Sequence, residues 1–286
     1  MNSAVIREQF HETRRSPSIS IIVVTYNAGD ALLRCLLALA MQESSDFECI
    51  VVDNAALESK TLSMFDVRYF KLDKNYGPSY ARNYGAQKAR GSVVVFVDDD
   101  AVANRDYVAA WNAAFEDASL VSARGRVIPL KKQSVYNSLA AHYDLGDGIV
   151  ESAITTEGNC AVRKDAFLRV GGFNPTLYGH EGVELSYRLS GRGRQLYVPD
   201  AVVYHDYADS LRKLLRKNFR HGYNGRRFAE RYPEVIEYVE GFHYIFLVNK
   251  ETKGWWWRRG IRMVLIALSR VAEIIGSLAY VAGWKL

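Results

Sequence analysis

Cysteine is scarce in this chain of 286 residues, with three scattered thiols at Cys35, Cys49 and Cys160. An odd number of cysteines without C-x-x-C spacing argues against a disulfide framework and against a metal site built on thiols. We expect ordinary reduced thiols in a cytosolic protein. The N-terminal stretch MNSAVIREQFHETRRSPS also lacks an apolar core of signal-peptide length, so we expect no secretion.

Two phosphate-binding motifs are missing as well. No G-x-G-x-x-G follows the first apolar run, and G-x-x-x-x-G-K-[ST] does not occur in the sequence. Their absence argues against a Rossmann dinucleotide site and against a P-loop. Internal repeats and low-complexity tracts are missing too.

What the sequence does contain is the composition of an ordinary globular protein, with 49% hydrophobic and 24% charged residues. The length allows one large domain or two modest ones with a real core. The formal net charge is +5, and basic residues gather in the last third of the chain. We divide the chain into an N-terminal extension (1–17), an α/β domain (18–205) and a basic amphipathic helical region (206–286).

Apolar runs rich in β-branched residues alternate with helical patterns in the first part of the α/β domain. Residues 18–27, 47–54 and 92–98 predict buried strands, and residues 77–91 predict a helix with Pro78 in its first turn. This alternation predicts βαβ units, and therefore a Rossmann-like, mostly parallel sheet with helices on both faces. The pattern beyond residue 100 is more mixed. We expect helices at 104–118, 134–145 and 180–191, a strand at 120–130, and two short strands at 194–199 and 201–205.

Three consecutive carboxylates follow the strand predicted at residues 92–98. Because side chains alternate along an extended chain, Asp98 and Asp100 point the same way and Asp99 points away. In an open α/β sheet, ligands bind outside the carboxyl ends of the strands, where these residues lie. Two carboxylates on one side favour a hard divalent cation such as Mg²⁺ or Mn²⁺. A solvated acidic loop is the alternative. The polar exits of the first two strands, TYN and VVDN, favour the metal site because they converge on the same crevice.

An ordered set of motifs resembles family 2 glycosyltransferases, which have the GT-A fold. The motifs are IIVVTYNAGDALLRCL, VVDNAA, NYGPSYARNYGAQKARGSVVVFVDDDA, EGNCAVRKDAFLRVGGFNPTLYGHEGVELSYRL and VVYH. The resemblance spans residues 18–205, two thirds of the chain. It implies transfer of a sugar from a nucleotide-sugar donor, UDP- or dTDP-linked, to a glycan or lipid-linked acceptor.

The resemblance also implies roles for individual residues around the donor. Asp53 would accept a hydrogen bond from the nucleotide base, and Asp98 would approach the ribose and the metal. Asp100 would ligate the Mn²⁺ or Mg²⁺ that holds the diphosphate, and His205 matches a third metal ligand. The remaining residues implied in the nucleotide-sugar pocket are Thr25, Tyr26, Asn27, Arg82, Asn83 and Asp99.

One position departs from the family pattern. The general base of inverting members comes from a Glu-Asp pair before the helix, and here Gly182 stands where that aspartate is expected. We expect Glu181 to be the base, at a helix start where a carboxylate is stabilised. Glu184 is the other catalytic candidate, although its spacing to Arg188 also suits a helix-stabilising ion pair. Asn159, in the segment EGN, and Arg188 are candidates for contact with acceptor or sugar. The departure leaves inversion or retention open.

The C-terminal third predicts membrane attachment. Residues 208–231 form a basic amphipathic pattern, and residues 255–284 join tryptophans and basic residues to a long apolar helix. Arg262, Arg270 and Glu273 argue against a lone transmembrane span. We favour a peripheral, monotopic anchor at the inner face of the cell membrane over a packed soluble helix, a span or a subunit interface. Clustered rather than interleaved aromatics argue against nucleic-acid binding.

Two other functions compete with a metal-dependent glycosyltransferase. Gly182 motivates the first, a catalytically degenerate GT-A domain that binds nucleotide or glycan and scaffolds a membrane-associated assembly complex. The second is a nucleotidyltransferase, which shares the α/β sheet and the metal. It would need a glycine-rich, basic first loop, which TYNAGD is not. The sequence leaves the sugar, the acceptor and the oligomeric state open.

Overall fold

The structure is a computed structural model, and it describes residues 5–9, 16–26, 29–55, 60–131, 134–137, 143–240 and 256–284. Within these residues the chain forms a ten-stranded sheet in the order β1-β4-β3-β2-β5-β9-β7-β10-β6, with β8 paired to β10. The strands are β1 Val5–Gln9, β2 Ile19–Thr25, β3 Phe47–Asp53, β4 Arg68–Leu72, β5 Val93–Asp98, β6 Val102–Ala103, β7 Leu120–Ile128, β8 Val150–Glu151, β9 Asn159–Arg163 and β10 Arg194–Tyr204. The helices are α1 Asp30–Ala40, η1 Lys60–Met64, α2 Pro78–Lys88, α3 Tyr107–Phe115, α4 Lys164–Arg169, α5 Glu181–Leu189, α6 Leu211–Arg231, α7 Pro233–Glu240 and α8 Trp256–Val281.

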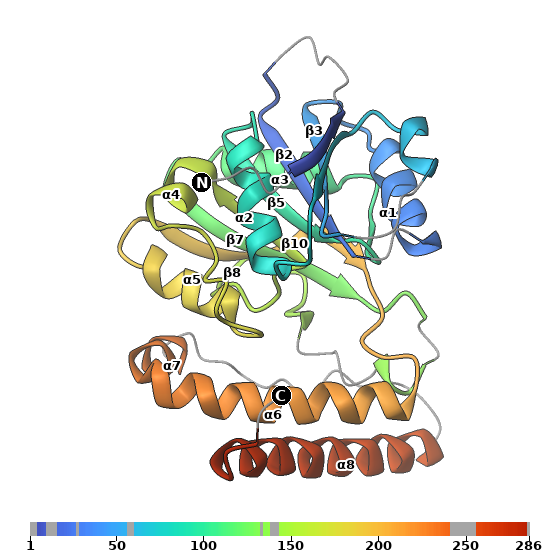
Figure 1. Ribbon diagram of the computed structural model, residues 1–286, viewed down its shortest axis with the longest axis vertical. Helices are drawn as coiled ribbons and strands as arrows, with labels where there is room; N and C mark the ends of the chain where they lie inside the picture. The colour runs from blue at the N-terminus through green and yellow to red at the C-terminus, as the bar shows by residue number, and fades with distance from the viewer. Residues whose placement is uncertain are drawn as a thin grey trace.

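The predicted α/β class is confirmed, and the two halves of the sheet differ in direction (Figure 1). Neighbouring strands from β4 to β5 are parallel, as the βαβ pattern predicts. Beyond β5, the antiparallel strand β9 is inserted before β7, so this half is mixed. The N-terminal extension contributes β1, which pairs antiparallel with β4 at the sheet edge.

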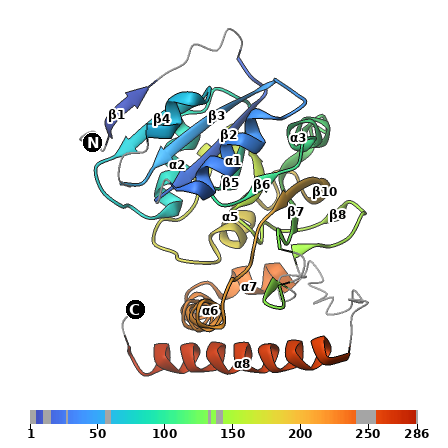
Figure 2. The ribbon, with the colours of Figure 1, turned by 90° about the vertical axis from the view of Figure 1, so that its right-hand side faces the viewer.

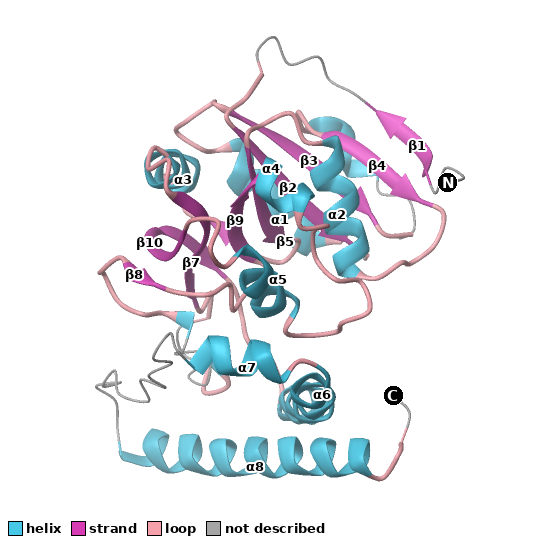
Figure 3. Ribbon diagram, turned by 90° about the vertical axis from the view of Figure 1, so that its left-hand side faces the viewer, coloured by secondary structure: helices cyan, strands magenta, loops and turns pink. Residues whose placement is uncertain are grey.

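Helices cover both faces of the sheet (Figure 3). Leu36 of α1 and Trp111 of α3 belong to the core on one face. Ala81 of α2, Phe167 of α4 and Leu185 of α5 belong to the core on the other. The strands between them are buried on both sides, which explains their continuous apolar sequences.

The two short strands predicted at 194–199 and 201–205 are one strand, β10. Its register against β7 shifts between Val198 and Val202, where Pro199 lies. Proline cannot donate to a strand ladder, and it is tolerated where the ladder is interrupted. Of the helix predicted at 134–145, residues 138–142 lie outside the described residues, and the described residues on either side of them form no α-helix.

The C-terminal helices form a separate layer beneath the sheet. Helix α8 lies across α6 on the side away from the sheet (Figures 1 and 2). Two glycines allow this approach: a Cβ on Gly222 would lie 1.8 Å from the carbonyl oxygen of Glu273, and a Cβ on Gly276 would lie 1.9 Å from that of Phe219. Among the described residues, α8 is the one helix long and apolar enough to cross a membrane, by length and composition.

Candidate active site

Three side chains from two strand ends converge on one point. Asp98 ends β5 and Asp100 follows it, while His205 follows β10. One ligand atom from each residue lies within 4.8 Å of the other two. His205 Nε2 is 3.0 Å from Asp100 Oδ1. Two carboxylates and one imidazole, all partly open to solvent, are a donor set that fits Mn²⁺ or Mg²⁺.

Asp100 and His205 form an ion pair when the imidazole is protonated. Burial acts to raise the pKa of Asp100, but the hydrogen bond and charge of His205 outweigh it and lower this pKa below its ordinary value. Burial acts to lower the pKa of His205, but Asp100 outweighs it and raises this pKa. A metal ion at this point would take the place of the imidazole proton, because a ligating histidine is neutral.

Asp99 lies in the turn after β5, beside Thr25 at the end of β2. Burial is the main cause that raises the pKa of Asp99 to about 6, and the Thr25 hydroxyl opposes the shift. Tyr26 is exposed at the same strand end, and Asn27 lies outside the described residues. Asp99 and Asp100 lie in the turn after β5 and not in the strand, so the alternation expected from the sequence does not apply to them.

Asp53 stands at the end of β3, directly opposite Thr25 in the strand register. Its side chain is 1% exposed, and the Tyr69 hydroxyl donates to Asp53 Oδ2 at 2.5 Å. The ends of β3, β2 and β5 therefore place Asp53, Thr25 and Asp98 along one edge, which is where a parallel sheet binds its ligand.

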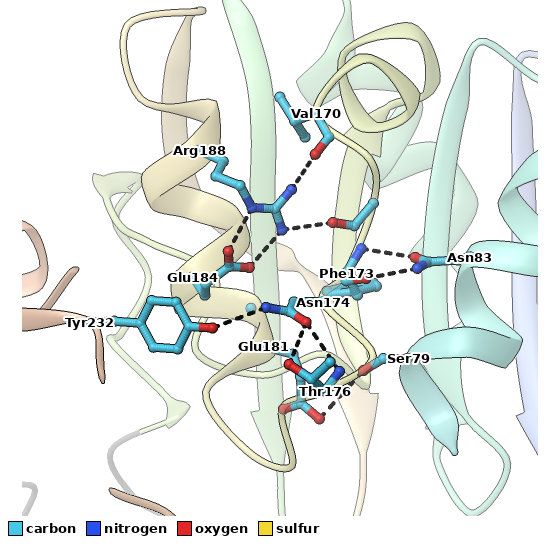
Figure 4. A network of polar contacts seen from close by, with 12 residues as sticks. Ser79, Asn83, Val170, Phe173, Asn174, Thr176, Glu181, Glu184, Arg188 and Tyr232 are labelled. Carbon is cyan, nitrogen blue, oxygen red and sulfur yellow. Dashed lines mark hydrogen bonds and ion pairs between the residues drawn. The ribbon is translucent and has the colours of Figure 1, made fainter. Parts of the chain in front are cut away.

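Arg82 of α2 faces the same edge. Its guanidinium donates to Asp98 Oδ1 at 2.8 Å, and its side chain is 11% exposed. Burial acts to lower the pKa of Arg82, but the charges of Asp98, Glu157 and Glu181 outweigh it and raise this pKa. The neighbouring residue, Asn83, is used differently. Its amide pairs with the backbone of Phe173, at 2.7 Å and 2.8 Å (Figure 4).

Glu184 and Arg188 form a bidentate ion pair on α5, at 2.7 Å and 2.6 Å (Figure 4). Arg188 also donates to the carbonyl oxygens of Val170 and Gly172. The Arg188 guanidinium thus holds α5 against the loop before Phe173. This agrees with the alternative in which the Glu184–Arg188 ion pair stabilises the helix. The catalytic role expected for Glu184 and the sugar contact expected for Arg188 find no support in these contacts.

Asn159 is fully buried, so the expected contact with acceptor or sugar does not fit the structure. Its amide nitrogen donates to the carbonyl oxygens of Arg126 and Ala201, at 2.9 Å and 3.0 Å. Its amide oxygen accepts from the Tyr107 hydroxyl at 2.8 Å. Asn159 therefore ties β9 to β7, β10 and α3. Asn159 became a candidate because it lies in the segment EGN, but its hydrogen bonds in the structure are structural.

A cleft of about 190 Å³ opens beside the Asp98–Asp100–His205 cluster. Sequence reasoning missed several of its residues. Glu157 is one, two positions from Asn159 in the segment EGN, and Lys217 and His221 of α6 are others. The Lys217 ammonium lies 3.6 Å from the ring centre of Tyr207. Burial is the main cause that lowers the pKa of Lys217 to about 8, although Asp98 and Asp100 oppose the shift. The helical periodicity of α6 indicates that Lys217 lies beside the buried face of the helix, next to Leu214 and Asn218, but not that this face meets the cleft.

Glu181 begins α5, as predicted, but its side chain is 4% exposed. The Ser79 hydroxyl donates to Glu181 Oε1 at 3.4 Å (Figure 4). Glu181 is not among the described residues that line the cleft. Its role as base stays a prediction.

Comparison with known proteins gives one family. The profile described as Glycosyl transferase family 2 matches residues 20–168, more than half of the chain. The chain is 25% identical over 232 residues to the pre-mycofactocin glycosyltransferase of Mycobacterium tuberculosis, covering 76% of this chain and 48% of that protein. It is 25% identical over 267 residues to the glucosyl-dolichyl phosphate glucuronosyltransferase of Haloferax volcanii, covering 81% of this chain and 85% of that protein. The chain thus spans about half the length of the first of these relatives.

Solved structures share the fold. The mannosyltransferase PcManGT from Pyrobaculum calidifontis, in complex with GDP-Man and Mn²⁺, has a TM-score of 0.65 at 16% identity, covering 95% of this chain and 89% of that chain. S. aureus TarS 1–349 in complex with UDP-GlcNAc has a TM-score of 0.57 at 16% identity, covering 93% and 92%. At this identity the likeness shows the fold alone, and that fold is GT-A-like.

Proposed function

Because the chain belongs to glycosyl transferase family 2, we propose that it moves a sugar from a nucleotide-sugar donor to a glycan or lipid-linked acceptor. The observation that carries the proposal is the convergence of Asp98, Asp100 and His205 at the strand edge that also holds Asp53 and Thr25. Binding of a nucleoside diphosphate requires a hydrogen-bond acceptor for the base and a metal ion for the diphosphate. Asp53 would supply the first, and Asp98, Asp100 and His205 would hold the second.

The donor would lie along the strand ends. Asp53 would accept a hydrogen bond from the N3–H of uracil or thymine, which favours a UDP- or dTDP-sugar. Thr25, Tyr26 and Asn27 would line the nucleotide pocket, with Asp99 beside Thr25. Asn83 would act indirectly, since it holds the backbone of Phe173.

Asp98, Asp100 and His205 would hold the divalent ion, Mn²⁺ or Mg²⁺. The ion would stabilise the negative charge that develops on the leaving diphosphate. Two protein cations, Arg82 and Lys217, face the same cleft and would add to that stabilisation. A general base must take the proton of the attacking hydroxyl, and Glu181 is the residue expected from the sequence.

We also propose that α6 and α8 attach the protein to the inner face of a membrane. Large apolar residues of α8 are exposed on the side away from α6: Val264, Leu268, Val271, Ile274, Ile275, Leu278 and Val281. Exposed basic residues lie along α6: Arg212, Lys213, Arg216, Arg220, Arg226 and Arg227. Apolar area next to positive charge suits the surface of an anionic bilayer. A lipid-linked acceptor would be available at such a surface.

A donor-binding screen tests the proposal. Thermal unfolding of the full chain is followed with UDP-, dTDP- and GDP-sugars, with and without Mn²⁺. At 100 times its Kd, a true donor should stabilise the protein by about 2.7 kcal/mol, and the shift should depend on Mn²⁺. Asp100→Ala should abolish the Mn²⁺-dependent part, whereas Asp165→Ala, which removes an exposed ion pair on α4, should not. If no nucleotide sugar binds or is turned over, or if Asp100→Ala behaves as wild type, the proposal is wrong.

A further inference from the structure

Gly182 is the position where the family resemblance leads one to expect the catalytic aspartate, and another carboxylate occupies the space beside it. A Cβ placed on Gly182 would lie 2.9 Å from Glu157 Oε1 and 2.7 Å from the carbonyl oxygen of Ile154. The backbone N–H of Gly182 donates to Glu157 Oε1 at 2.6 Å. Glycine at this position therefore leaves room for the Glu157 carboxylate, which arrives from a segment 25 residues earlier.

The same carboxylate faces the cleft beside the metal-binding cluster. Glu157 lines the cleft together with Arg82, Asp98 and His205. The next residue, Gly158, allows this approach, because a Cβ there would lie 2.0 Å from Asp98 Oδ2. Two glycines thus bring Glu157 between the start of α5 and the end of β5. Glu181, by contrast, is buried and reaches toward Ser79.

We propose that Glu157 is the general base of the transfer reaction and replaces the aspartate that Gly182 lacks. The inference rests on the proposed function. In the step, the acceptor O–H gives its proton to the Glu157 carboxylate while its oxygen forms a bond to the anomeric carbon. The bond between that carbon and the diphosphate oxygen breaks, and its electron pair leaves with the nucleoside diphosphate. A single displacement of this kind inverts the anomeric carbon.

The charges around Glu157 suit this role. Burial is the main cause that raises the pKa of Glu157, and the charge of Glu181 adds to the shift, while Arg82 and the Gly182 N–H oppose it. A base works best when its pKa lies near the operating pH. The other titratable groups that face it or share its cleft are Cys160, His180, Asp98, Tyr143, His205, Tyr207, Lys217 and His221. Glu181 becomes a positioning residue, which acts on the reaction through the pKa of Glu157.

A purely structural role for Glu157 has to be separated from catalysis, because its carboxylate also accepts the N–H of Gly182 at the start of α5. Glu157→Gln keeps the shape and an acceptor oxygen but removes the basicity. We would measure release of nucleoside diphosphate by the full chain with Mn²⁺, from the sugar nucleotide that binds in the screen and with water as acceptor. This readout requires no knowledge of the natural acceptor. Glu151→Gln, on exposed strand β8, is the matched control.

Glu157→Gln should lower turnover by roughly 10²–10⁴-fold while donor affinity and the unfolding temperature stay near wild type. The loss of activity toward acid pH should disappear from its pH profile. Glu181→Gln should keep that acidic limb but move it to lower pH, because removing the charge of Glu181 lowers the pKa of Glu157. Sodium formate should restore part of the turnover of Glu157→Ala, since formate can act as base in the space left.

Three outcomes would overturn the inference. Glu157→Gln could turn over like wild type. Glu181→Gln, and not Glu157→Gln, could abolish turnover and the acidic limb, which would make Glu181 the base. Glu157→Gln could lose donor binding and thermal stability together, with no formate rescue of Glu157→Ala, which would make Glu157 structural. All three require a wild type that turns over a nucleotide sugar. A wild type that binds and cleaves none would instead overturn the proposed function itself, and the base with it.

Discussion

The sheet and helix α8 place their apolar side chains in opposite ways. In β5, Val94, Val95 and Phe96 are fully buried between the two helix layers. In α8, the side that packs on α6 carries mostly small residues, and the large apolar residues point outward. From Val264 onward, where the burial of α8 is described, the buried positions are Leu265, Ser269, Ala272, Gly276 and Ala279.

This difference shows what each region requires to be stable. The sheet completes its own core, because both of its faces are covered by helices of the same domain. Helix α8 comes into close backbone contact with α6 at Gly222 and Gly276. Its outer face has no cover among the described residues, and a contiguous apolar face of this kind marks an interaction surface.

The largest expected effect is in the sheet. Leu120 of β7 is 0% exposed, and Leu278 of α8 is 61% exposed. Leu120→Ala should lower the free energy of unfolding by roughly 2–5 kcal/mol, because it leaves a cavity in a packed core. Leu278→Ala should change it by less than about 0.5 kcal/mol. Urea denaturation of both variants measures the difference. Equal costs would mean that α8 is buried in solution and that the comparison is false.

The next effect breaks the contact between α6 and α8. Gly276→Leu should force the two helices apart, because even a Cβ would meet the Phe219 carbonyl. Overpacking costs about 1–3 kcal/mol or more, and here it should be confined to the helical layer. Limited proteolysis should therefore cut α8 earlier while donor binding at the sheet persists. Ile275→Leu, on the exposed face, is the control. An unchanged digestion pattern would contradict the packing.

The sequence predicted the regions in which local pattern and burial agree. The strands that end at Thr25, Asp53 and Asp98 were predictable because short apolar runs rich in β-branched residues are typical of buried strands. The orientations of Asp99 and Asp100 were predicted from strand alternation, but β5 ends at Asp98 and both residues lie in the turn after it. The start of α5 at Glu181 was also predicted, within a helical pattern.

The parts that could not be predicted depend on contacts between distant segments. Nothing local to Gly182 indicates that Glu157 fills the space beside it. Nothing local to Asn159 indicates that its amide bridges three elements, in contacts that give the expected ligand contact no support. The inward position of Lys217 depends on how α6 packs beneath the sheet. In each case a side chain was placed by tertiary packing, which the sequence pattern does not encode.

A smaller effect is expected on membrane binding, and it tests whether the exposed apolar face of α8 binds a membrane. Ile275→Gln combined with Leu278→Gln should weaken binding to vesicles of phosphatidylglycerol and phosphatidylcholine by about tenfold or more. Full burial of one apolar side chain contributes roughly 1.5–3 kcal/mol, and losing part of this at two positions reaches the about 1.4 kcal/mol that corresponds to a tenfold change. Leu37→Gln, at an exposed apolar position of α1 in the sheet domain, should bind as wild type does. Co-sedimentation measures both. Wild-type binding by the double variant would sink the membrane assignment for this face.

The smallest effect concerns the ion pair on the outer side of α8. Arg270 donates to Glu273 at 2.8 Å, and the arginine side chain is 62% exposed. An exposed pair of this kind contributes about 0–1 kcal/mol, so Arg270→Gln should leave urea denaturation almost unchanged in the absence of lipid. On anionic vesicles the same substitution should weaken binding several-fold, because a basic residue near the surface contributes about 1 kcal/mol there. High salt should abolish that difference but not the one caused by Ile275→Gln and Leu278→Gln, since screening acts on charge and not on apolar area. If Arg270→Gln instead lowers stability without lipid, Arg270 supports the contact between α6 and α8. Arg270 would then not belong to the outer face of α8.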